Sequence, residues 1–323
     1  MKLTMYGTRG STPTPSNPKF STIEFGGETT CKHIEASDGS DYIVDAGSGI
    51  RPLGNELLQK YQGAVEARIL ISHPHWDHIQ GFPFFKPAYS PAGKLAVYSG
   101  HHEVKEKLEK QGGSGTTFHH KATNKNDHVN TTKRFFEGQQ EGAYFPLGIE
   151  QMGGEVFFYE SKEKSLESGS MKVTSMWHEG HPGGMCAYKF TDGGKTIVSL
   201  GDYEQDGKVT KDGFELGERD KQLVAFAKGA DIAIMDCQYT LDEYNGKTGG
   251  PSRKFWGHSH PKSVLAMATA AGVGEVIATH HDPEHDDDFL RNVESATQAD
   301  VIKTFKNNST KVTFARFGLE RMV

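Results

Sequence analysis

Residues 66–78 read EARILISHPHWDH, an apolar run that leads directly into four side chains of metal-ligand type. The first seven residues predict a buried strand that ends at His73. His73 and His75 alternate along an extended chain, so both face one way and can bind one ion. Asp77 and His78 follow as a helix begins, and we expect them to face a second ion nearby. Three imidazoles and a carboxylate are costly to bury without partners, so this stretch predicts a binuclear metal site.

The composition indicates a single globular chain. Among 323 residues, 36 are basic and 42 acidic, and this net charge of -6 argues against a protein dedicated to coating nucleic acid. Three cysteines without a CxxC motif exclude a disulfide framework and a cysteine-type zinc site. The first ten residues, MKLTMYGTRG, lack the apolar run of a signal peptide, and no stretch is apolar enough to span a membrane. We therefore expect a cytoplasmic protein with no membrane partner.

The order of predicted elements favours two sheets over a single parallel sheet. Short apolar runs cut by Gly-rich turns predict strands up to about residue 200, and strands and helices alternate after that. Without a repeat or a long linker, residues 1–323 are expected to form one domain. The segment 111–135 differs, because it is polar, contains three His, and carries four basic residues against one acidic residue. It is either a solvated surface excursion or a mobile flap that brings positive charge to an anionic substrate.

Four further motifs accompany HPHWDH in a fixed order, each after an apolar run. They are VDAGSG with Asp45, HPGG with His181, SLGDYE with Asp202 and VIATHHDP with His280. Together with HPHWDH they resemble the motif set of the metallo-β-lactamase fold superfamily. The resemblance implies an αββα sandwich, in which two mixed sheets lie face to face, helices cover the outside, and the metals lie at one edge.

The resemblance also implies how the ligands divide between two divalent ions. One ion would take His73, His75 and His181, and the other would take Asp77, His78 and His280. Asp202 would bridge both ions together with a water or hydroxide. Asp45 is expected behind the ligands, where it would accept an imidazole N–H and fix its tautomer. His178 and His281 are neighbouring rivals of His181 and His280.

Within the superfamily the chain is most similar to the ribonuclease Z-like branch, which includes cyclic-nucleotide phosphodiesterases and tRNA 3′-processing nucleases. The similar stretches are YGTRGSTPTP, FGGETTC, HWDHIQGFPFF, AYFPLGIEQMGGEV and GHSHPKSVLAMATAAGV. His258 in Gly257-His258-Ser259 matches an additional active-site histidine of that branch, and we expect it to act as general acid. His260 follows where the branch usually has Thr or Ser, so it is a rival of His258. The branch also implies a homodimer.

The sequence thus predicts a binuclear metal hydrolase, foremost a phosphodiesterase that acts on a small cyclic nucleotide or related diester through a bridging hydroxide. Asp77 would orient that hydroxide as well as bind metal. The imidazole-rich shell suits zinc, with manganese or iron as alternatives. The rival enzymes are an RNA-processing nuclease of ribonuclease Z type, disfavoured by the net charge, and a hydrolase of carboxylic esters, thioesters or lactones. The non-enzymatic alternative is a metal- or nucleotide-binding sensor module.

Overall fold

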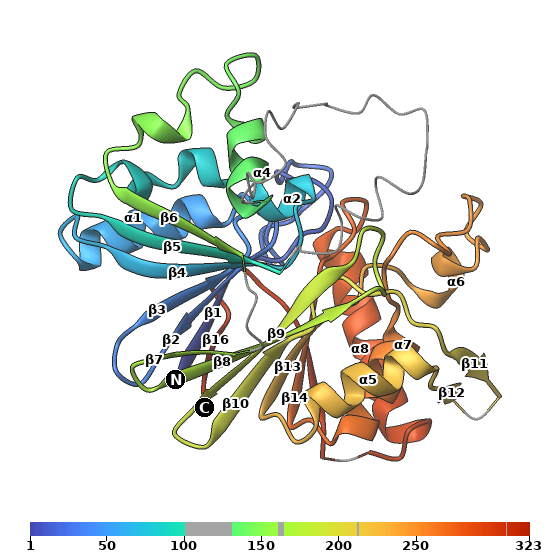
Figure 1. Ribbon diagram of the computed structural model, residues 1–323. Helices are drawn as coiled ribbons and strands as arrows, with labels where there is room; N and C mark the ends of the chain where they lie inside the picture. Colours follow the sequence, from blue (N-terminus) through green and yellow to red (C-terminus); the bar gives the residue numbers. More distant parts are fainter. Residues whose placement is uncertain (101–130, 161–164, 212, 308) are drawn as a thin grey trace, which may run out of the picture.

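Two seven-stranded sheets lie face to face in the computed structural model, which describes residues 1–100, 131–160, 165–211, 213–307 and 309–323 (Figure 1). The strand order is β16-β1-β2-β3-β4-β5-β6 in the first sheet and β15-β14-β13-β10-β9-β8-β7 in the second. Each sheet is mixed: β3 to β6 run parallel beside antiparallel neighbours, as do β10, β13, β14 and β15. The predicted pair of mixed sheets is confirmed.

The strands are short, as the Gly-rich turns predict. The first sheet contains β1 (Lys2–Gly7), β2 (Cys31–Glu35), β3 (Asp41–Val44), β4 (Glu66–Ile71), β5 (Lys94–Ser99), β6 (Glu155–Glu160) and β16 (Glu320–Met322). The second contains β7 (Ser165–Ser168), β8 (Met171–His178), β9 (Met185–Asp192), β10 (Lys195–Ser199), β13 (Ile232–Asp236), β14 (Glu275–Thr279) and β15 (Lys311–Phe314). A separate hairpin consists of β11 (Lys208–Thr210) and β12 (Gly213–Glu215).

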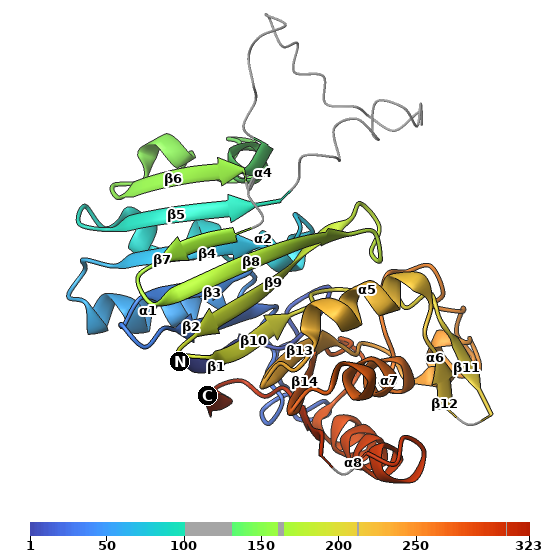
Figure 2. The ribbon, with the colours of Figure 1, turned by 60° about the horizontal axis from the view of Figure 1, so that its bottom comes forward.

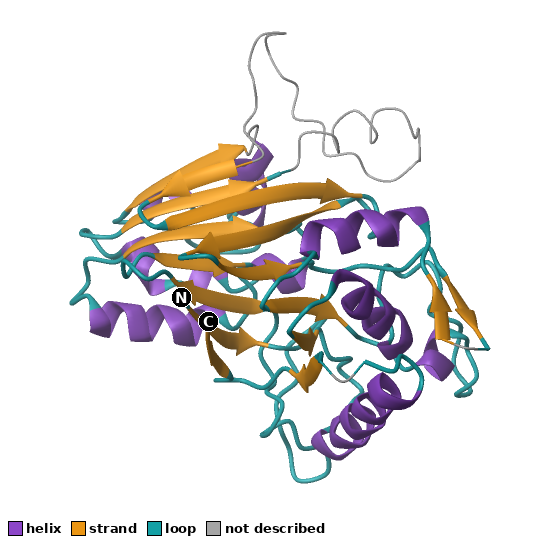
Figure 3. Ribbon diagram, turned by 90° about the horizontal axis from the view of Figure 1, so that it is seen from below, coloured by secondary structure: helices purple, strands orange, loops and turns teal. Residues whose placement is uncertain are grey.

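Helices cover the outer faces of both sheets (Figure 3). Beside the first sheet lie α1 (Ile50–Lys60), α2 (Trp76–Ile79), α4 (Thr131–Gln139) and the 3-10 turns η1 (Phe82–Phe84), η2 (Lys86–Tyr89) and η3 (Ile149–Gln151). Beside the second sheet lie α5 (Glu218–Ala227), α6 (Leu241–Tyr244), α7 (Pro261–Ala271) and α8 (Asp287–Lys303).

Three apolar clusters account for the layers. One lies between α1 and the first sheet and includes Leu53, Leu57 and Ile69. The second fills the space between the sheets, with residues such as Leu3, Tyr42, Phe190, Ile234 and Ile277. The third joins the second sheet to α5, α7 and α8. Each helix buries one apolar side against a sheet, and the two sheets bury apolar faces against each other. The αββα sandwich follows from this stacking of apolar surfaces, and the predicted fold is confirmed.

The carboxyl ends of the parallel strands meet at one edge of the sandwich. In the first sheet β3 and β4 run parallel, and in the second β10, β13 and β14 run parallel (Figure 2). An acidic or imidazole side chain lies at or just beyond the end of each of these five strands. Asp236 is the last residue of β13, and the loops after the other four strands carry Asp45, His73, Asp202 and His280. This is the edge at which the sequence places the metals.

Most of the expected elements form, with small shifts at their ends. The turn Asp192-Gly193-Gly194 joins β9 to β10 with φ of 57° and 80° at the two glycines, conformations that glycine adopts without strain. The sequence predicts a helix over roughly residues 283–306, whereas α8 begins at Asp287. The Asp286 side chain accepts a hydrogen bond from the backbone of Phe289 and caps the helix there.

The polar segment is only partly described. Residues 111–130, where most of the expected flap or surface excursion falls, lie outside the described residues. The remaining residues, 131–135, open α4, in which Phe136 packs against Phe82 with ring centres 4.3 Å apart. Among the helices that the structure describes, none combines the length and the apolar character that crossing a bilayer requires.

Candidate metal centre

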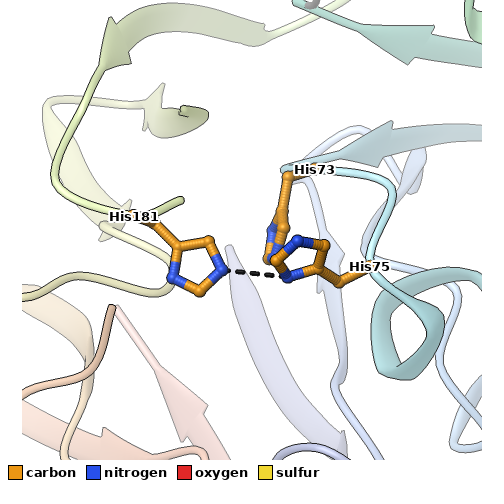
Figure 4. Close-up of side chains that lie close together, drawn as sticks. All are labelled: His73, His75 and His181. Atoms are coloured by element: carbon orange, nitrogen blue, oxygen red, sulfur yellow. Dashed lines mark hydrogen bonds between the residues drawn. The ribbon is translucent and has the colours of Figure 1, made fainter. Parts of the chain in front are cut away.

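Three imidazoles from two loops form the first ligand group (Figure 4). His73 and His75 follow β4, and His181 lies in the loop between β8 and β9. One ring nitrogen from each lies within 4.8 Å of the other two, and Nε2 of His181 is 3.0 Å from Nδ1 of His75. His73 and His181 are buried, whereas His75 is exposed, so the group opens to solvent on the His75 side.

The hydrogen bonds of this group leave lone pairs free for a metal. Nδ1 of His181 donates to the Gly257 carbonyl at 2.9 Å, which leaves Nε2 as an acceptor facing the group. Nε2 of His73 is buried and has no hydrogen-bond partner. Burial lowers the pKa of His73 well below its usual range and that of His181 to about 3. Neutral imidazoles whose nitrogens face one another, with Nε2 of His73 unpaired, fit a divalent ion.

Asp77, His78, Asp202 and His280 form the second group, again with ligand atoms within 4.8 Å of one another. Oδ2 of Asp202 lies 3.0 Å from Nε2 of His78 and 3.1 Å from Nε2 of His280. The same oxygen lies 3.7 Å from Nε2 of His73 in the first group. Asp202 therefore stands between the two groups, where a bridging carboxylate is required.

The second group is charged. Burial would raise the pKa of Asp77 and Asp202, yet the imidazoles of His78 and His280 hold both well below the usual range. Burial would likewise lower the pKa of His78 and His280, but Asp202 and Asp77 raise it well above 6.5 for His78 and to about 10 for His280. Protons on these imidazoles thus balance the two buried carboxylates, and divalent cations can take over that role.

Residues behind the ligands fix their orientation. Oδ2 of Asp45 lies 3.0 Å from Nδ1 of His78, so that Nε2 of the same ring faces Asp202. Oε1 of Gln238 lies 3.1 Å from Nδ1 of His280. The backbone N–H of Ser11 donates to Oδ2 of Asp77 at 2.9 Å. Such contacts set the tautomers and angles of metal ligands.

Asp45 itself is held by a buried cation. Nζ of Lys32 lies 3.0 Å from Oδ2 of Asp45, and both side chains are almost entirely buried, with 3% and 0% of their surface exposed. The backbone N–H and the hydroxyl of Ser72 donate to Oδ1 of Asp45 at 2.8 and 2.7 Å. Burial would raise the pKa of Asp45, but Lys32 and His78 lower it to about 2. Asp45 is therefore a buried anion whose charge is balanced by Lys32 and by hydrogen bonds from Ser72.

His258 adjoins both groups. Its ring lies 4.8 Å from that of His280 and nearly parallel to it, and 5.1 Å from that of His181. Nδ1 of His258 is 2.8 Å from Oδ2 of Asp236, a residue at the end of β13. Asp202, Asp236, His258 and His280 form a third set of ligand-type atoms within 4.8 Å of one another.

The rival histidines point elsewhere. His178 lies 3.3 Å from the Leu200 carbonyl, and His281 lies 2.8 Å from that of Ala315. His260 caps α7, where its Nδ1 accepts from the backbone of Ser263. None of the three belongs to a ligand group among the described residues.

Four supporting residues, Ser11, Lys32, Glu204 and Gln238, were not identified from the sequence. The sequence around Lys32 gave no signal of its burial, because the strand CKHIE contains Lys, His and Glu at three of its five positions. The others act from loops whose approach to the site depends on tertiary packing. Glu204 accepts from the backbone N–H of Gly257 at 2.8 Å and so positions the carbonyl that orients His181.

Comparison with known proteins agrees with this geometry. The family model described as the β-lactamase superfamily domain matches residues 41–281. The chain is 27% identical to ribonuclease BN of Escherichia coli over 264 residues, which cover 76% of this chain and 80% of the relative.

Solved structures share the fold. YhfI of Bacillus subtilis, a metallo-β-lactamase fold protein, aligns with a TM-score of 0.62 at 17% identity over 99% of this chain and 98% of that one. Unliganded yeast PDE1 aligns with a TM-score of 0.63 at 14% identity over 100% and 99% of the two chains. The short form of human tRNase Z aligns with a TM-score of 0.56 at 15% identity over 100% and 99%. This chain, with its two sheets, its His and Asp cluster and its matching family model, belongs to the metallo-β-lactamase superfamily.

Proposed function

We propose that this chain is a binuclear metal-dependent phosphodiesterase that acts on a small diester such as a cyclic nucleotide. The observation that carries the proposal is the position of Asp202 between two ligand groups, with His258 beside both. Two metals held a few ångströms apart are a known arrangement for displacement at phosphorus. The names of the relatives, a ribonuclease and a phosphodiesterase among them, support a phosphoester substrate.

The ligand set favours zinc. Five imidazoles and two carboxylates are predicted as ligands, and nitrogen-rich shells suit zinc better than magnesium. Bound divalent ions would supply Lewis acidity and lower the pKa of a water. Asp77, whose Oδ2 accepts from the backbone of Ser11, would help to hold that water in line with phosphorus.

His258 would protonate the leaving oxygen. Asp236 holds Nδ1 of the ring, which leaves Nε2 to carry a proton to the substrate. The ring is buried to all but 9% and packs against His181 and His280, so its direction is fixed. An imidazole of fixed direction beside the candidate metal ligands is suited to donate a proton to a leaving oxygen.

A second candidate function is RNA processing. The similarity to ribonuclease BN over three quarters of the chain favours it. The net charge of -6 opposes it, because nucleases that grip long RNA rely on extended basic surfaces. We place the small diester first for this reason.

The test combines metal content with hydrolysis. Elemental analysis of the purified protein should give about two ions per chain. Wild type, Asp202→Ala and the surface control Asp288→Ala are then assayed on bis(p-nitrophenyl) phosphate, a panel of cyclic nucleotides, a precursor tRNA and a thioester. Asp288 is a matched control because its side chain is 81% exposed at the start of α8.

The outcomes separate the candidates. Cyclic-nucleotide turnover that Asp202→Ala abolishes and Asp288→Ala retains would support the proposal. Cleavage of precursor tRNA alone would establish the nuclease. Thioester turnover without diester turnover would refute both, and a chain that holds no metal in excess zinc or manganese would refute the metal centre.

A further inference from the structure

The loop that leads into His258 exposes two aromatic side chains. Phe255 is 89% exposed and Trp256 is 47% exposed, although both rings are large and apolar. Arg253 and Lys254 precede them, so the loop carries two cations beside the two rings. Single exposed apolar residues require no explanation, but adjacent aromatic rings next to a candidate active site are typical of a binding surface.

The loop is held in a strained conformation by a buried carboxylate. Phe255 has a φ of 69°, which is rare for a bulky residue. Glu204, which is 8% exposed, accepts from the backbone N–H of Phe255 at 2.7 Å and from that of Gly257 at 2.8 Å. The hydroxyl of Tyr244 donates to the same carboxylate at 2.7 Å. Strain that the surroundings enforce is a feature of functional loops, and here it keeps the rings at the surface.

Rings that meet edge to face connect this loop with the candidate metal centre. The guanidinium carbon of Arg253 lies 4.5 Å from the ring centre of Trp256 and 5.7 Å from that of Tyr239. The ring of Tyr239 lies 6.5 Å from that of Trp256 and 5.9 Å from that of His258. Tyr239, which is 4% exposed, thus lies beside both Trp256 and His258 and links the exposed loop to the candidate site.

We infer that the exposed ring of Trp256, together with the guanidinium of Arg253, forms a stacking surface for the nucleobase of the substrate. The inference rests on the proposed function, because it presumes a ligand whose phosphate lies at the metals. Bases stack on aromatic faces and on guanidinium planes, and Trp offers the largest face. The positive charge of Arg253 and Lys254 also suits an anionic ligand. If the rings served only to pack the loop, removing Trp256 would affect all ligands alike.

The experiment compares ligands that share a phosphate and differ in the base. Isothermal titration of the zinc-loaded protein measures the Kd of adenosine 5′-monophosphate and of ribose 5-phosphate. For wild type we expect the nucleotide to bind at least about tenfold more tightly, which is the effect of one base–aromatic stack. Trp256→Ala should bring that ratio close to one and leave ribose 5-phosphate unaffected, whereas Trp256→Phe should retain most of the preference.

Phe157→Ala is the matched control, since Phe157 is 50% exposed on β6, an edge strand of the first sheet. It should keep the wild-type ratio. A wild-type ratio near one, or the same ratio in Trp256→Ala, would overturn the stacking surface and leave the proposed function standing. Equal weakening of both ligands in Trp256→Ala would assign Trp256 to loop packing and would also overturn it. Failure of wild type to bind either phosphate would refute the proposed function and the stacking surface together.

Discussion

Replacing Lys32 tests how far the candidate metal centre depends on the charged residues that contact its ligands. We predict that Lys32→Met lowers the free energy of unfolding, because it leaves Asp45 buried without its cation. Lys32 and Asp45 expose 3% and 0% of their side chains, and their charged atoms lie 3.0 Å apart. Breaking such a buried pair typically costs 3–5 kcal/mol. Asp45 keeps three hydrogen-bond donors in this variant, two from Ser72 and one from His78. We therefore expect a loss of unfolding free energy at the lower end of this range, about 3 kcal/mol.

Lys60→Met is the matched control. Nζ of Lys60 also lies 3.0 Å from a carboxylate oxygen, that of Glu35, but the two side chains are 42% and 34% exposed. Exposed ion pairs contribute about 0–1 kcal/mol, so this variant should unfold almost as wild type does. The contrast tests burial, because residue type, substitution and the shortest ion-pair distance are the same. Lys60 also lies 3.9 Å from the buried Asp41, but that carboxylate keeps His33 at 2.8 Å in the variant.

Urea unfolding followed by circular dichroism measures both variants, with a double variant Lys32→Met/Asp45→Asn to complete the cycle. The double variant should lose less unfolding free energy than the two single variants lose in sum, because it leaves no unpaired buried charge. Equal losses of unfolding free energy in Lys32→Met and Lys60→Met would refute the argument that burial makes the Lys32–Asp45 pair important. So would strict additivity of Lys32→Met and Asp45→Asn.

Four further variants test the acid, the turns and the pH dependence. His258→Ala should lower kcat by about 10²–10⁴ and keep the metal content of wild type, as general acid catalysis predicts, whereas loss of metal would make His258 a ligand. Gly194→Ala should cost about 1 kcal/mol of stability, since a Cβ there meets no atom within 4 Å and only the positive φ is strained. Gly47→Ala should cost more than about 2 kcal/mol and reduce metal content, because its Cβ would lie 2.2 Å from the carbonyl oxygen of Asp77. Burial would raise the pKa of Glu243, but His285 and the Thr240 backbone lower it to about 2. Wild type should therefore be more thermally stable than Glu243→Gln by a constant difference above about pH 4.5, and this difference should vanish as the pH falls toward 2. A difference that does not narrow would contradict this.

Residue patterns alone locate the ligands because strand ends determine where they lie. Alternation in an apolar strand predicts the end of β4, and β4 does end at Ile71, two residues before His73. Parallel neighbours must end at the same edge, so an acidic or imidazole residue after each strand predicts a shared site. Helix α7 and strand β14 have the bounds that periodicity predicts, because Pro261 and Gly272 mark the helix ends.

The supporting contacts could not be predicted in the same way, since they depend on how distant loops pack. Gln238 reaches His280 from another strand end, and Glu204 reaches Gly257 across 53 residues of chain. The helix α1 was missed because Pro52 and Gly54 lie within its 11 residues, Ile50–Lys60. Pro is tolerated there because it stands in the first turn, where its missing N–H has no helical partner.

The ligands come from both sheets, and this division has a consequence for folding. His73, His75, Asp77 and His78 follow β4 of the first sheet, whereas His181, Asp202 and His280 follow strands of the second. Each proposed ion would therefore take ligands from both sheets, and neither site exists until the sheets have docked. A ligand that binds only the docked state stabilises that state by mass action. The apolar layer between the sheets and the metal centre at their edge are thus energetically coupled, so metal affinity reports on the packing of the sandwich as well as on the ligands.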